Sequence, residues 1–424
     1  MAREMVCYLL AGKTMKKPKI AIFHLGFFYS GGGERLVLEE IKGLRKRGYK
    51  VTCFAPIVDE QLSYPEIIVD LKVEPLLPQL PAWFPSREGL LIIVSCFLIP
   101  FLVLRFRKFD VIYGANQPGP WYGWVIEKIL GKPYIIYLAQ PTRMLYPRQV
   151  DLEAGFSLRR NLRLLPYLIK LGRPFISWAD KKSIKGARVM LTGGEYNGKL
   201  IEKTYGKKRT VCYAGCYPLS PKEIAHKNRW QGRLRVNGFL IRKPFILLTN
   251  RHVPQKKFEY AISAMTAILK EIPQTSLVIT GEENEYTEFL KFLTKRLGLE
   301  EKIIFLGFVK EKDLERLYCQ AAVYVYPAPQ EDFGMGIVEA MAAGTPVVAW
   351  NFAGPTDTVV NGKTGFLAKP YDILDYADKI IKLLKNPSVV NKMGLAGWQR
   401  AKEKFSYQKR LDILEGELLR AVKK

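Results

Sequence analysis

Short apolar runs alternate with amphipathic segments along the chain, and this alternation starts twice. Residues 20–25, 34–47 and 50–55 read as strand, helix and strand, and further apolar runs follow at 111–113, 134–138 and 189–192. A second series opens at residue 245 and predicts five strands, at 245–249, 276–280, 303–306, 323–326 and 346–349, with helices between them. Unbroken apolar strands separated by helices are typical of parallel sheets covered on both faces.

The alternation therefore predicts an α/β fold built from two doubly wound, Rossmann-like domains. The chain has 424 residues, about twice the size at which a single hydrophobic core stops growing, which also favours two domains. In such sheets, ligands bind outside the carboxyl ends of the strands. We therefore expect the functional residues in the strand-to-helix loops that line an interdomain cleft.

The first such loop is rich in glycine. Residues 30–34, Ser-Gly-Gly-Gly-Glu, follow the first strand directly and open the first helix. Without Cβ atoms, Gly31 and Gly32 let backbone N–H groups approach an anion at the helix N-terminus. A tight connection with no ligand is the alternative interpretation.

The second loop is basic. Residues 250–257, Asn-Arg-His-Val-Pro-Gln-Lys-Lys, also lie between a strand and a helix. The guanidinium of Arg251 and the ammonium of Lys257 suit a diphosphate. A solvated basic loop is the alternative.

The third loop carries two glutamates. Glu331 and Glu339 lie eight residues apart, and Gly334 and Gly336 between them free backbone N–H groups at the start of a helix. This pattern can hold hydroxyls and phosphate oxygens together. Two surface glutamates beside a helix cap would not explain why the loop is glycine-rich while the following helix is apolar.

No metal site is expected. The six cysteines, at positions 7, 53, 96, 212, 216 and 319, lack paired spacing and are interpreted as free thiols. Cys212 and Cys216 have no second ligand pair with zinc-like spacing, and no Asp-x-Asp motif occurs in a suitable loop.

These motifs together resemble glycosyltransferase family 4. The resemblance is carried by the 31–34 turn, Arg251 with Lys257, Glu331 with Glu339, and Gly354-Pro355 followed by residues 360–367, and it covers nearly the whole chain from Lys19. It implies the GT-B fold of two facing Rossmann-like domains, at 16–215 and 216–404, with a C-terminal helix at 405–424 returning to the first. It also implies sugar transfer from a nucleotide donor with retention of configuration and without a bound metal or other cofactor.

The resemblance also assigns roles to residues. Arg251 and Lys257 would hold the donor diphosphate, Glu339 the ribose, and Glu331 the hydroxyls of the transferred sugar. The backbone of Phe333, Gly334 and Met335 would contact sugar and phosphate, and Gly31 and Gly32 would close over the diphosphate. Within the family, residues 31–37 and 330–339 look similar to mannosyltransferases acting on lipid-linked or surface glycans, which favours GDP-mannose as donor.

One position departs from the family pattern. Many members have a histidine in a Tyr-x-His-x-Pro-x-Arg stretch, where this chain has Ala139. Gln140 and Arg143 of that stretch remain candidates for the acceptor side. The substitution keeps open a catalytically impaired sugar-nucleotide-binding scaffold, whereas the basic and acidic pairs disfavour a nucleotide-sugar epimerase. His24, beside apolar residues, is interpreted as structural.

The net charge is +26 and lies almost entirely in the first half. Residues 1–250 hold 41 basic and 18 acidic side chains, whereas residues 251–400 hold 18 of each. No zinc spacing, KH loop or RNP motif supports nucleic-acid binding. The excess instead points to an anionic membrane surface, reached from the cytoplasmic side as a peripheral protein.

An apolar run at residues 90–104 fits this interpretation in one of two ways. Fifteen residues are too few to span a bilayer, so the run is either a buried core helix or an in-plane anchor with aromatic and basic flanks. Residues 151–250 hold 21 basic and 6 acidic side chains, Arg159, Arg160 and Arg163 among them. Solubility alone is the other explanation for this charge.

Overall fold

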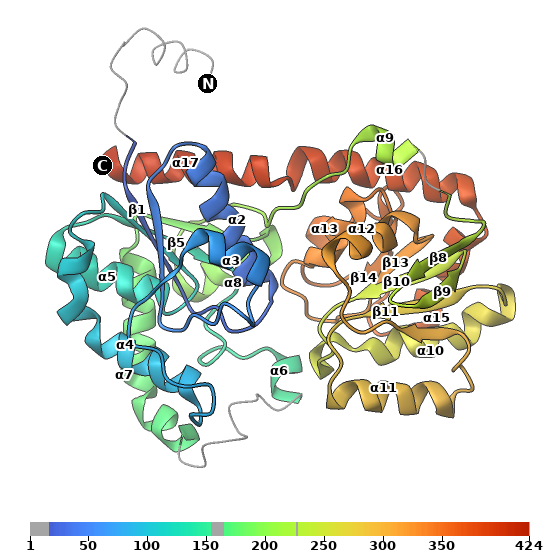
Figure 1. The fold of residues 1–424 in the computed structure, drawn as a ribbon, viewed down its shortest axis with the longest axis horizontal. Helices are drawn as coiled ribbons and strands as arrows, with labels where there is room; N and C mark the ends of the chain where they lie inside the picture. The colour runs from blue at the N-terminus through green and yellow to red at the C-terminus, as the bar shows by residue number, and fades with distance from the viewer. Residues whose placement is uncertain (1–16, 154–164, 226–227, 424) are drawn as a thin grey trace, which may run out of the picture.

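The computed structural model describes residues 17–153, 165–225 and 228–423. Two parallel sheets stand side by side, each covered by helices on both faces (Figure 1). The α/β fold of two Rossmann-like domains expected from the sequence is confirmed. Arg159, Arg160 and Arg163 lie outside the described residues, so the expectation that their charge faces a membrane stays a prediction.

The first sheet has the strand order β3-β2-β1-β4-β5-β6-β7, and every neighbouring pair is parallel. Its central strands are fully buried because their apolar side chains meet helices on both faces. The strands are β1 (Ile20–His24), β2 (Val51–Ala55), β3 (Glu74–Pro75), β4 (Val111–Ala115), β5 (Tyr134–Leu138), β6 (Val189–Thr192) and β7 (Thr210–Val211).

The helices around this sheet include one that is unusually apolar. They are α2 (Gly32–Lys46), α3 (Pro65–Leu71), α4 (Arg87–Leu102), the 3-10 turn η1 (Val103–Phe106), α5 (Gly119–Leu130), α6 (Gln149–Glu153), α7 (Leu165–Gly186) and α8 (Glu195–Tyr205). The α4 helix continues through η1 to give 20 residues, long and apolar enough by length and composition to cross a membrane. The expectation that this run is too short to span was therefore wrong, because the helix extends beyond residues 90–104 at both ends.

The second sheet has the order β12-β11-β10-β13-β14-β15, again all parallel. Its strands are β10 (Phe245–Thr249), β11 (Ser276–Thr280), β12 (Ile303–Phe305), β13 (Val323–Tyr326), β14 (Val347–Trp350) and β15 (Gly365–Ala368). Its helical elements are η3 (Pro254–Lys256), α10 (Phe258–Glu271), α11 (Glu285–Arg296), α12 (Glu311–Gln320), α13 (Met335–Ala342), α14 (Pro355–Thr358), α15 (Ile373–Leu384) and α16 (Pro387–Lys404).

An antiparallel hairpin and a short helix precede this sheet. The hairpin pairs β8 (Arg233–Val236) with β9 (Phe239–Arg242), and α9 covers Pro221–Ala225. The sequence did not predict the hairpin, because its strands are short and its Asn237-Gly238 turn lies among charged residues.

The chain passes between the two domains at two adjacent places. After the first sheet it crosses at Cys216, and after α16 it crosses back at Phe405 into α17 (Tyr407–Lys423). The two crossings are joined by backbone hydrogen bonds, from Cys216 N to Phe405 O at 2.7 Å and from Tyr407 N to Cys216 O at 3.1 Å. Figure 1 shows α16 and α17 running along one edge of both domains.

A buried ion pair fixes α17 to the first domain. Arg410 donates from Nε to Glu40 Oε1 of α2 at 2.8 Å, and both side chains are fully buried. Arg410 also donates from Nη1 to the carbonyl oxygens of Cys212 and Tyr213, at 2.5 and 3.0 Å. Removing one partner of such a pair costs about 3–5 kcal/mol. The C-terminal helix therefore returns to the first domain, as expected.

Candidate active site

The glycine-rich loop meets the second domain directly. Gly31 is the N-cap of α2, and a Cβ there would collide with the side chains of Tyr29 and Glu34. A Cβ on Gly32 would lie 3.3 Å from Met335 Cγ, which belongs to the other side of the cleft. Glycine at 31 thus permits the fold of the loop itself, glycine at 32 permits the close interdomain approach, and the loop lies against Met335 at the start of α13.

Arg251 also reaches across the cleft. Its guanidinium lies 5.0 Å from the ring centroid of Tyr29. Beneath this contact lies Glu34, which is 3% exposed and shares a hydrogen bond with Tyr29. Burial raises the pKa of Glu34 to about 7, although Tyr29 and Arg251 act in the opposite direction. A titratable carboxyl therefore lies next to the proposed diphosphate site.

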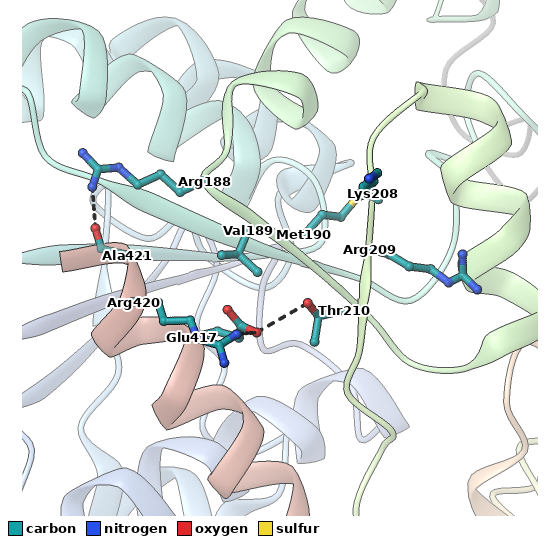
Figure 2. A pocket seen from close by; sticks show the side chains of 9 residues that line it. All are labelled: Arg188, Val189, Met190, Lys208, Arg209, Thr210, Glu417, Arg420 and Ala421. Atoms are coloured by element: carbon teal, nitrogen blue, oxygen red, sulfur yellow. Dashed lines mark hydrogen bonds and ion pairs between the residues drawn. The ribbon is translucent and has the colours of Figure 1, made fainter. Parts of the chain in front are cut away.

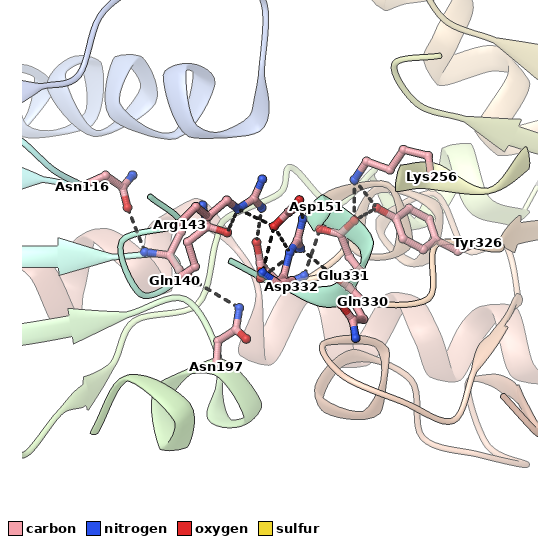
Figure 3. A network of polar contacts seen from close by, with 12 residues as sticks. Asn116, Gln140, Arg143, Asp151, Asn197, Lys256, Tyr326, Gln330, Glu331 and Asp332 are labelled. Atoms are coloured by element: carbon pink, nitrogen blue, oxygen red, sulfur yellow. Dashed lines mark hydrogen bonds and ion pairs between the residues drawn. The ribbon is translucent and has the colours of Figure 1, made fainter. Parts of the chain in front are cut away.

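Glu331 is held as a carboxylate by two partners of its own domain. Its Oε2 accepts hydrogen bonds from Lys256 Nζ at 2.5 Å and from Tyr326 OH at 2.6 Å (Figure 3). Burial alone would raise the pKa of Glu331, but Lys256, Tyr326 and more distant Arg148 outweigh it and lower the pKa to about 2. The other oxygen, Oε1, accepts from Asp332 N at 3.1 Å. A fixed anion with one less engaged oxygen can accept a hydrogen bond from a substrate hydroxyl.

The neighbouring lysine points elsewhere. Lys257 has a left-handed backbone (φ 51°), begins α10, and places Nζ 3.7 Å from Glu259 of the same helix. The turn thus directs the two adjacent lysines apart: Lys256 points toward Glu331, and Lys257 points toward Glu259 of α10. Sequence reasoning singled out Lys257 and missed Lys256 and Tyr326. The convergence of Arg251 and Lys257 on one diphosphate stays a prediction.

The turn after Glu331 sets the start of α13. Phe333 packs against Tyr213 and Phe405, with ring centroids 6.0 and 5.8 Å apart. Gly334 then adopts φ 87°, a conformation that favours glycine, and α13 begins at Met335. The buried phenylalanine and the left-handed glycine together fix where α13 begins, next to Gly32 of the first domain.

Glu339 lines a separate hollow of about 100 Å³ between the domains. It accepts a hydrogen bond from Tyr318 OH at 2.9 Å. Arg35 of α2 and Tyr217 of the crossing segment complete this side of the hollow. Glu331 and Glu339 therefore face two different parts of the interdomain region, and their roles toward sugar and ribose stay predictions.

The stretch with the departure from the family pattern is firmly held. The backbone of Ala139 is bonded to the side chains of Asn116 and Asn197, at 2.9 and 3.0 Å (Figure 3). Gln140 Oε1 accepts from Arg143 Nε at 2.6 Å, and Arg143 Nη2 donates to Asp332 Oδ2 at 2.9 Å. Gln140 thus orients Arg143 toward the Glu331 turn, and both acceptor-side candidates line the cleft.

His24 lies away from these contacts. It is 2% exposed, and burial lowers its pKa to about 4, so it is neutral at physiological pH. Its Nδ1 lies 3.0 Å from the carbonyl oxygen of Gly26, to which the neutral ring donates when Nδ1 carries the proton. These contacts agree with a structural role. Among the residues that the structure describes, no group of three or more His, Cys, Asp or Glu side chains could hold a metal ion.

A larger cavity, of about 220 Å³, lies away from the cleft between β6, β7 and α17 (Figure 2). Its walls carry several arginines, but these already have partners. Arg188 donates to Ala421 O at 2.6 Å, and Arg420 donates to Glu417 at 3.0 Å. The Glu417 carboxylate also faces this space, which lies apart from the interdomain contacts described above.

Two facing Rossmann-like domains, with a glycine loop, a basic loop and paired glutamates at their cleft, define a glycosyltransferase of the GT-B fold. The family models for Glycosyltransferase Family 4 and Glycosyl transferases group 1 match residues 30–215 and 235–400. The chain belongs to glycosyltransferase family 4, which confirms the resemblance found in the sequence.

Some relatives match nearly the whole chain, and others match only part of it. Human alpha-1,3/1,6-mannosyltransferase ALG2 is 30% identical over 422 residues, which cover 93% of this chain and 94% of that protein. The ALG2 protein of Dictyostelium discoideum is 34% identical over 182 residues, covering 39% of this chain and 43% of that protein. The solved sucrose-phosphate synthase from Thermosynechococcus elongatus shares the fold, with a TM-score of 0.71, 18% identity, and coverage of 95% of this chain and 98% of that one.

Proposed function

We propose that this glycosyltransferase moves mannose from GDP-mannose to a lipid-linked or surface-glycan acceptor, with retention of configuration and without a bound metal. The observation that carries the proposal is the fixed Glu331 carboxylate, which lies in a cleft where Gly32, Arg251 and Arg143 all make contacts between the domains. Mannose is supported by the match to human ALG2, which extends over nearly the whole of both chains.

The reaction breaks the bond between the sugar C1 and the donor phosphate oxygen, and the bonding electrons leave with the diphosphate. The acceptor hydroxyl oxygen bonds to C1 on the same face, and its proton passes to the departing phosphate oxygen. Arg251 and Lys257 would stabilise the diphosphate as negative charge develops, a role otherwise open to a metal ion. The N–H groups of Gly31 and Gly32 would approach the same anion from the first domain.

Glu331 is suited to hold the sugar rather than to attack it. A carboxyl whose pKa is about 2 is a weak base, and Lys256 and Tyr326 already use Oε2. Its Oε1 would therefore accept from a sugar hydroxyl and stabilise the positive charge that develops near C1. Glu339, in the separate hollow, would accept from the ribose hydroxyls.

The apolar α4 helix supports a membrane-bound acceptor. Its buried residues Leu91, Ser95 and Ile99 recur every fourth position, and Ser95 Oγ lies 2.6 Å from Tyr122 OH of α5. The outer face instead exposes Phe97, Phe101 and Leu104, which are 65%, 80% and 68% exposed. A helix docked on one face and apolar on the other fits insertion into the plane of a bilayer.

Aromatic side chains extend this outer surface to α7. Phe175 and Trp178 are exposed and stacked on each other, and both contact Trp121 of α5. Figure 1 shows α4 and α7 at the same end of the first domain. Tryptophan favours the membrane–water interface, and the basic first half favours anionic lipids. We therefore place the enzyme on the cytoplasmic membrane face as a peripheral protein.

Transfer assays with and without acceptor test the proposal. Purified protein, GDP-mannose and polyprenyl-diphosphate-linked oligosaccharides should give an α-mannosylated product, and Glu331→Ala should remove most turnover. Near wild-type turnover by Glu331→Ala would refute the proposed contact between Glu331 and the transferred sugar. Donor binding without transfer to any acceptor would favour the scaffold alternative, and conversion of the donor sugar without acceptor would favour an epimerase.

A further inference from the structure

The segment that follows β5 in the first domain contacts the turn that carries Glu331 in the second. Arg148 Nη1 donates to Gln330 O at 2.5 Å, and Val150 N donates to Gln330 Oε1 at 3.2 Å. Figure 3 shows Arg143, Asp151, Gln330 and Asp332 gathered beside Glu331. The residues on both sides of Glu331 are therefore bonded to the opposite domain.

Two arginines and two aspartates make up the centre of this contact. Asp332 pairs with Arg143 at 2.9 Å and with Arg148 at 3.4 Å. Asp151 is 1% exposed, accepts from Arg148 Nε and Nη2 at 3.0 Å each, and lies 3.7 Å from Arg143. Two positive and two negative charges balance, so this cluster leaves no unpaired cation for an anionic ligand. Its contacts serve the protein itself.

Each side of the contact is anchored within its own domain. On the first-domain side, Asp180 is 5% exposed and accepts hydrogen bonds from Thr142, Tyr205 and Gln117, at 2.6, 2.9 and 2.8 Å. On the other side, Gly354 N donates to Glu331 O at 2.8 Å. The four charged side chains thus join two firm supports rather than two free loops.

We propose that Arg143, Arg148, Asp151 and Asp332 form an interdomain clamp whose members are positioning residues for Glu331. Asp332 N donates to Glu331 Oε1, so a shift of Asp332 moves both the backbone of Glu331 and a hydrogen bond to its substrate-facing oxygen. Lys256 and Tyr326 hold the other oxygen from within the second domain. The carboxylate is therefore fully oriented only when the two domains are closed. The inference rests on the proposed contact between Glu331 and the sugar.

Kinetics of Arg148→Met and Asp332→Ala test the clamp. Each change lowers kcat roughly 10- to 100-fold, the loss expected when a reacting group is misplaced by about 1 Å. The Kd for GDP alone changes less than kcat does, because the proposed contacts of Arg251, Lys257 and Glu339 lie within the second domain and only those of Gly31 and Gly32 depend on closure. The double variant loses no more than the worse single variant, since both changes open the same clamp. Arg148→Lys, which keeps a donor and a charge, restores part of kcat.

Arg209→Met is the matched control. Arg209 pairs with Glu195 and Glu202 within the first domain, and its side chain is 14% exposed against 20% for Arg148. The kcat of the Arg209→Met variant stays near that of wild type. Wild-type kcat in both clamp variants, or losses that add in the double variant, would overturn the proposal.

Small-angle X-ray scattering without substrate gives a readout that does not depend on turnover. Asp332→Ala increases the radius of gyration because the domains separate, whereas Arg209→Met does not. Thermal unfolding first establishes that Asp332→Ala is folded. An unchanged radius of gyration in this folded variant then counts against the clamp. If wild-type protein transfers no sugar while the radius changes as expected, the clamp stands and the proposed function fails.

Discussion

Replacing Lys256 by methionine isolates the interaction that keeps Glu331 charged. The ammonium lies 2.5 Å from Glu331 Oε2, and the two side chains are 19% and 14% exposed. Methionine keeps most of the length and volume of the stem but removes the charge. Tyr326 OH still donates to that oxygen and Arg148 still lowers the pKa, but the strongest group that opposes burial is gone, so the pKa of Glu331 rises from its wild-type value.

The expected loss of stability is about 3 kcal/mol at pH 7. The pKa of Glu331 falls from its usual 4.5 to about 2 on folding, and each unit corresponds to about 1.4 kcal/mol. Breaking a buried ion pair from one side costs a similar amount, about 3–5 kcal/mol. For a domain of this size we expect the melting temperature to fall by roughly 6–12 °C.

The pH dependence of this loss has a defined sign. Because the pKa of Glu331 is lowered in the folded state, its contribution is complete above the unfolded value of about 4.5 and is lost as the pH falls through about 2. The difference in unfolding free energy between wild type and Lys256→Met should therefore be largest near pH 8 and should narrow as the pH falls. Two effects act in this direction: the variant regains stability as its less ionised Glu331 takes up a proton, and wild type loses the ion-pair contribution below about pH 4.5.

Urea and thermal unfolding of Lys256→Met beside Lys257→Met provide the assay. Lys257 lies 3.7 Å from Glu259, with both side chains more than a quarter exposed, so its removal should cost at most about 1 kcal/mol. Lys257→Met should instead weaken binding of GDP. Equal destabilisation by the two variants, or a loss below about 0.5 kcal/mol for Lys256→Met, would refute the reasoning.

Three further predictions follow from the same structure. Arg251→Met should weaken GDP binding about 10- to 100-fold, measured by calorimetry, because a charge-assisted contact contributes about 1.5–3 kcal/mol. The melting temperature should change little. Unchanged affinity would exclude a role of Arg251 at the diphosphate. Burial raises the pKa of Glu34 to about 7, so its neutral form is favoured by folding and wild-type stability should fall by up to about 3 kcal/mol as the pH rises from about 4.5 to 7. Glu34→Gln should flatten this part of the unfolding profile, and an identical slope in both proteins would contradict the assignment. Replacing Phe97, Phe101 and Leu104 together by serine should reduce sedimentation with anionic vesicles at least 10-fold. The control Phe292→Ser, at an exposed site on α11, should not reduce it. Equal sedimentation of the two variants would argue against α4 as the docking helix.

The fold could be predicted from the sequence because its signal is local. Runs such as residues 245–249 and 276–280 carry an unbroken apolar centre and became strands with those same bounds. The β8–β9 hairpin gave no such signal, because its exposed positions carry residues such as Arg233 and Arg235 and break the apolar run. The length of α4 was also missed, since the helix begins at a charged residue, Arg87, ahead of the apolar segment.

The site was predictable only where chemistry lies within one loop. Glu331, Glu339, Gly31 and Gly32 stand in motifs that a single stretch of sequence reveals. The partner of Glu331 required a choice between two adjacent lysines, which depends on a left-handed turn at Lys257 that sequence does not show. The contact between Arg148 and Asp332 joins residues far apart in the chain, and nothing in either local sequence points to the other.

The paired crossings at Cys216 and Phe405 determine how the enzyme can open. Because the two chain connections are hydrogen-bonded side by side, the domains can move relative to each other mainly by rotation about one axis through these connections. Because Arg410 fixes α17 to the first domain, that axis lies near residues 405–406, at the edge where α16 meets α17 in Figure 1. In Figure 1 the α6 contact lies on the side of the molecule away from α16 and α17, so a rotation about the crossing displaces its two halves relative to each other. Rotation about the crossing would thus separate Arg148 from the turn that carries Glu331 and open that side of the cleft to an acceptor.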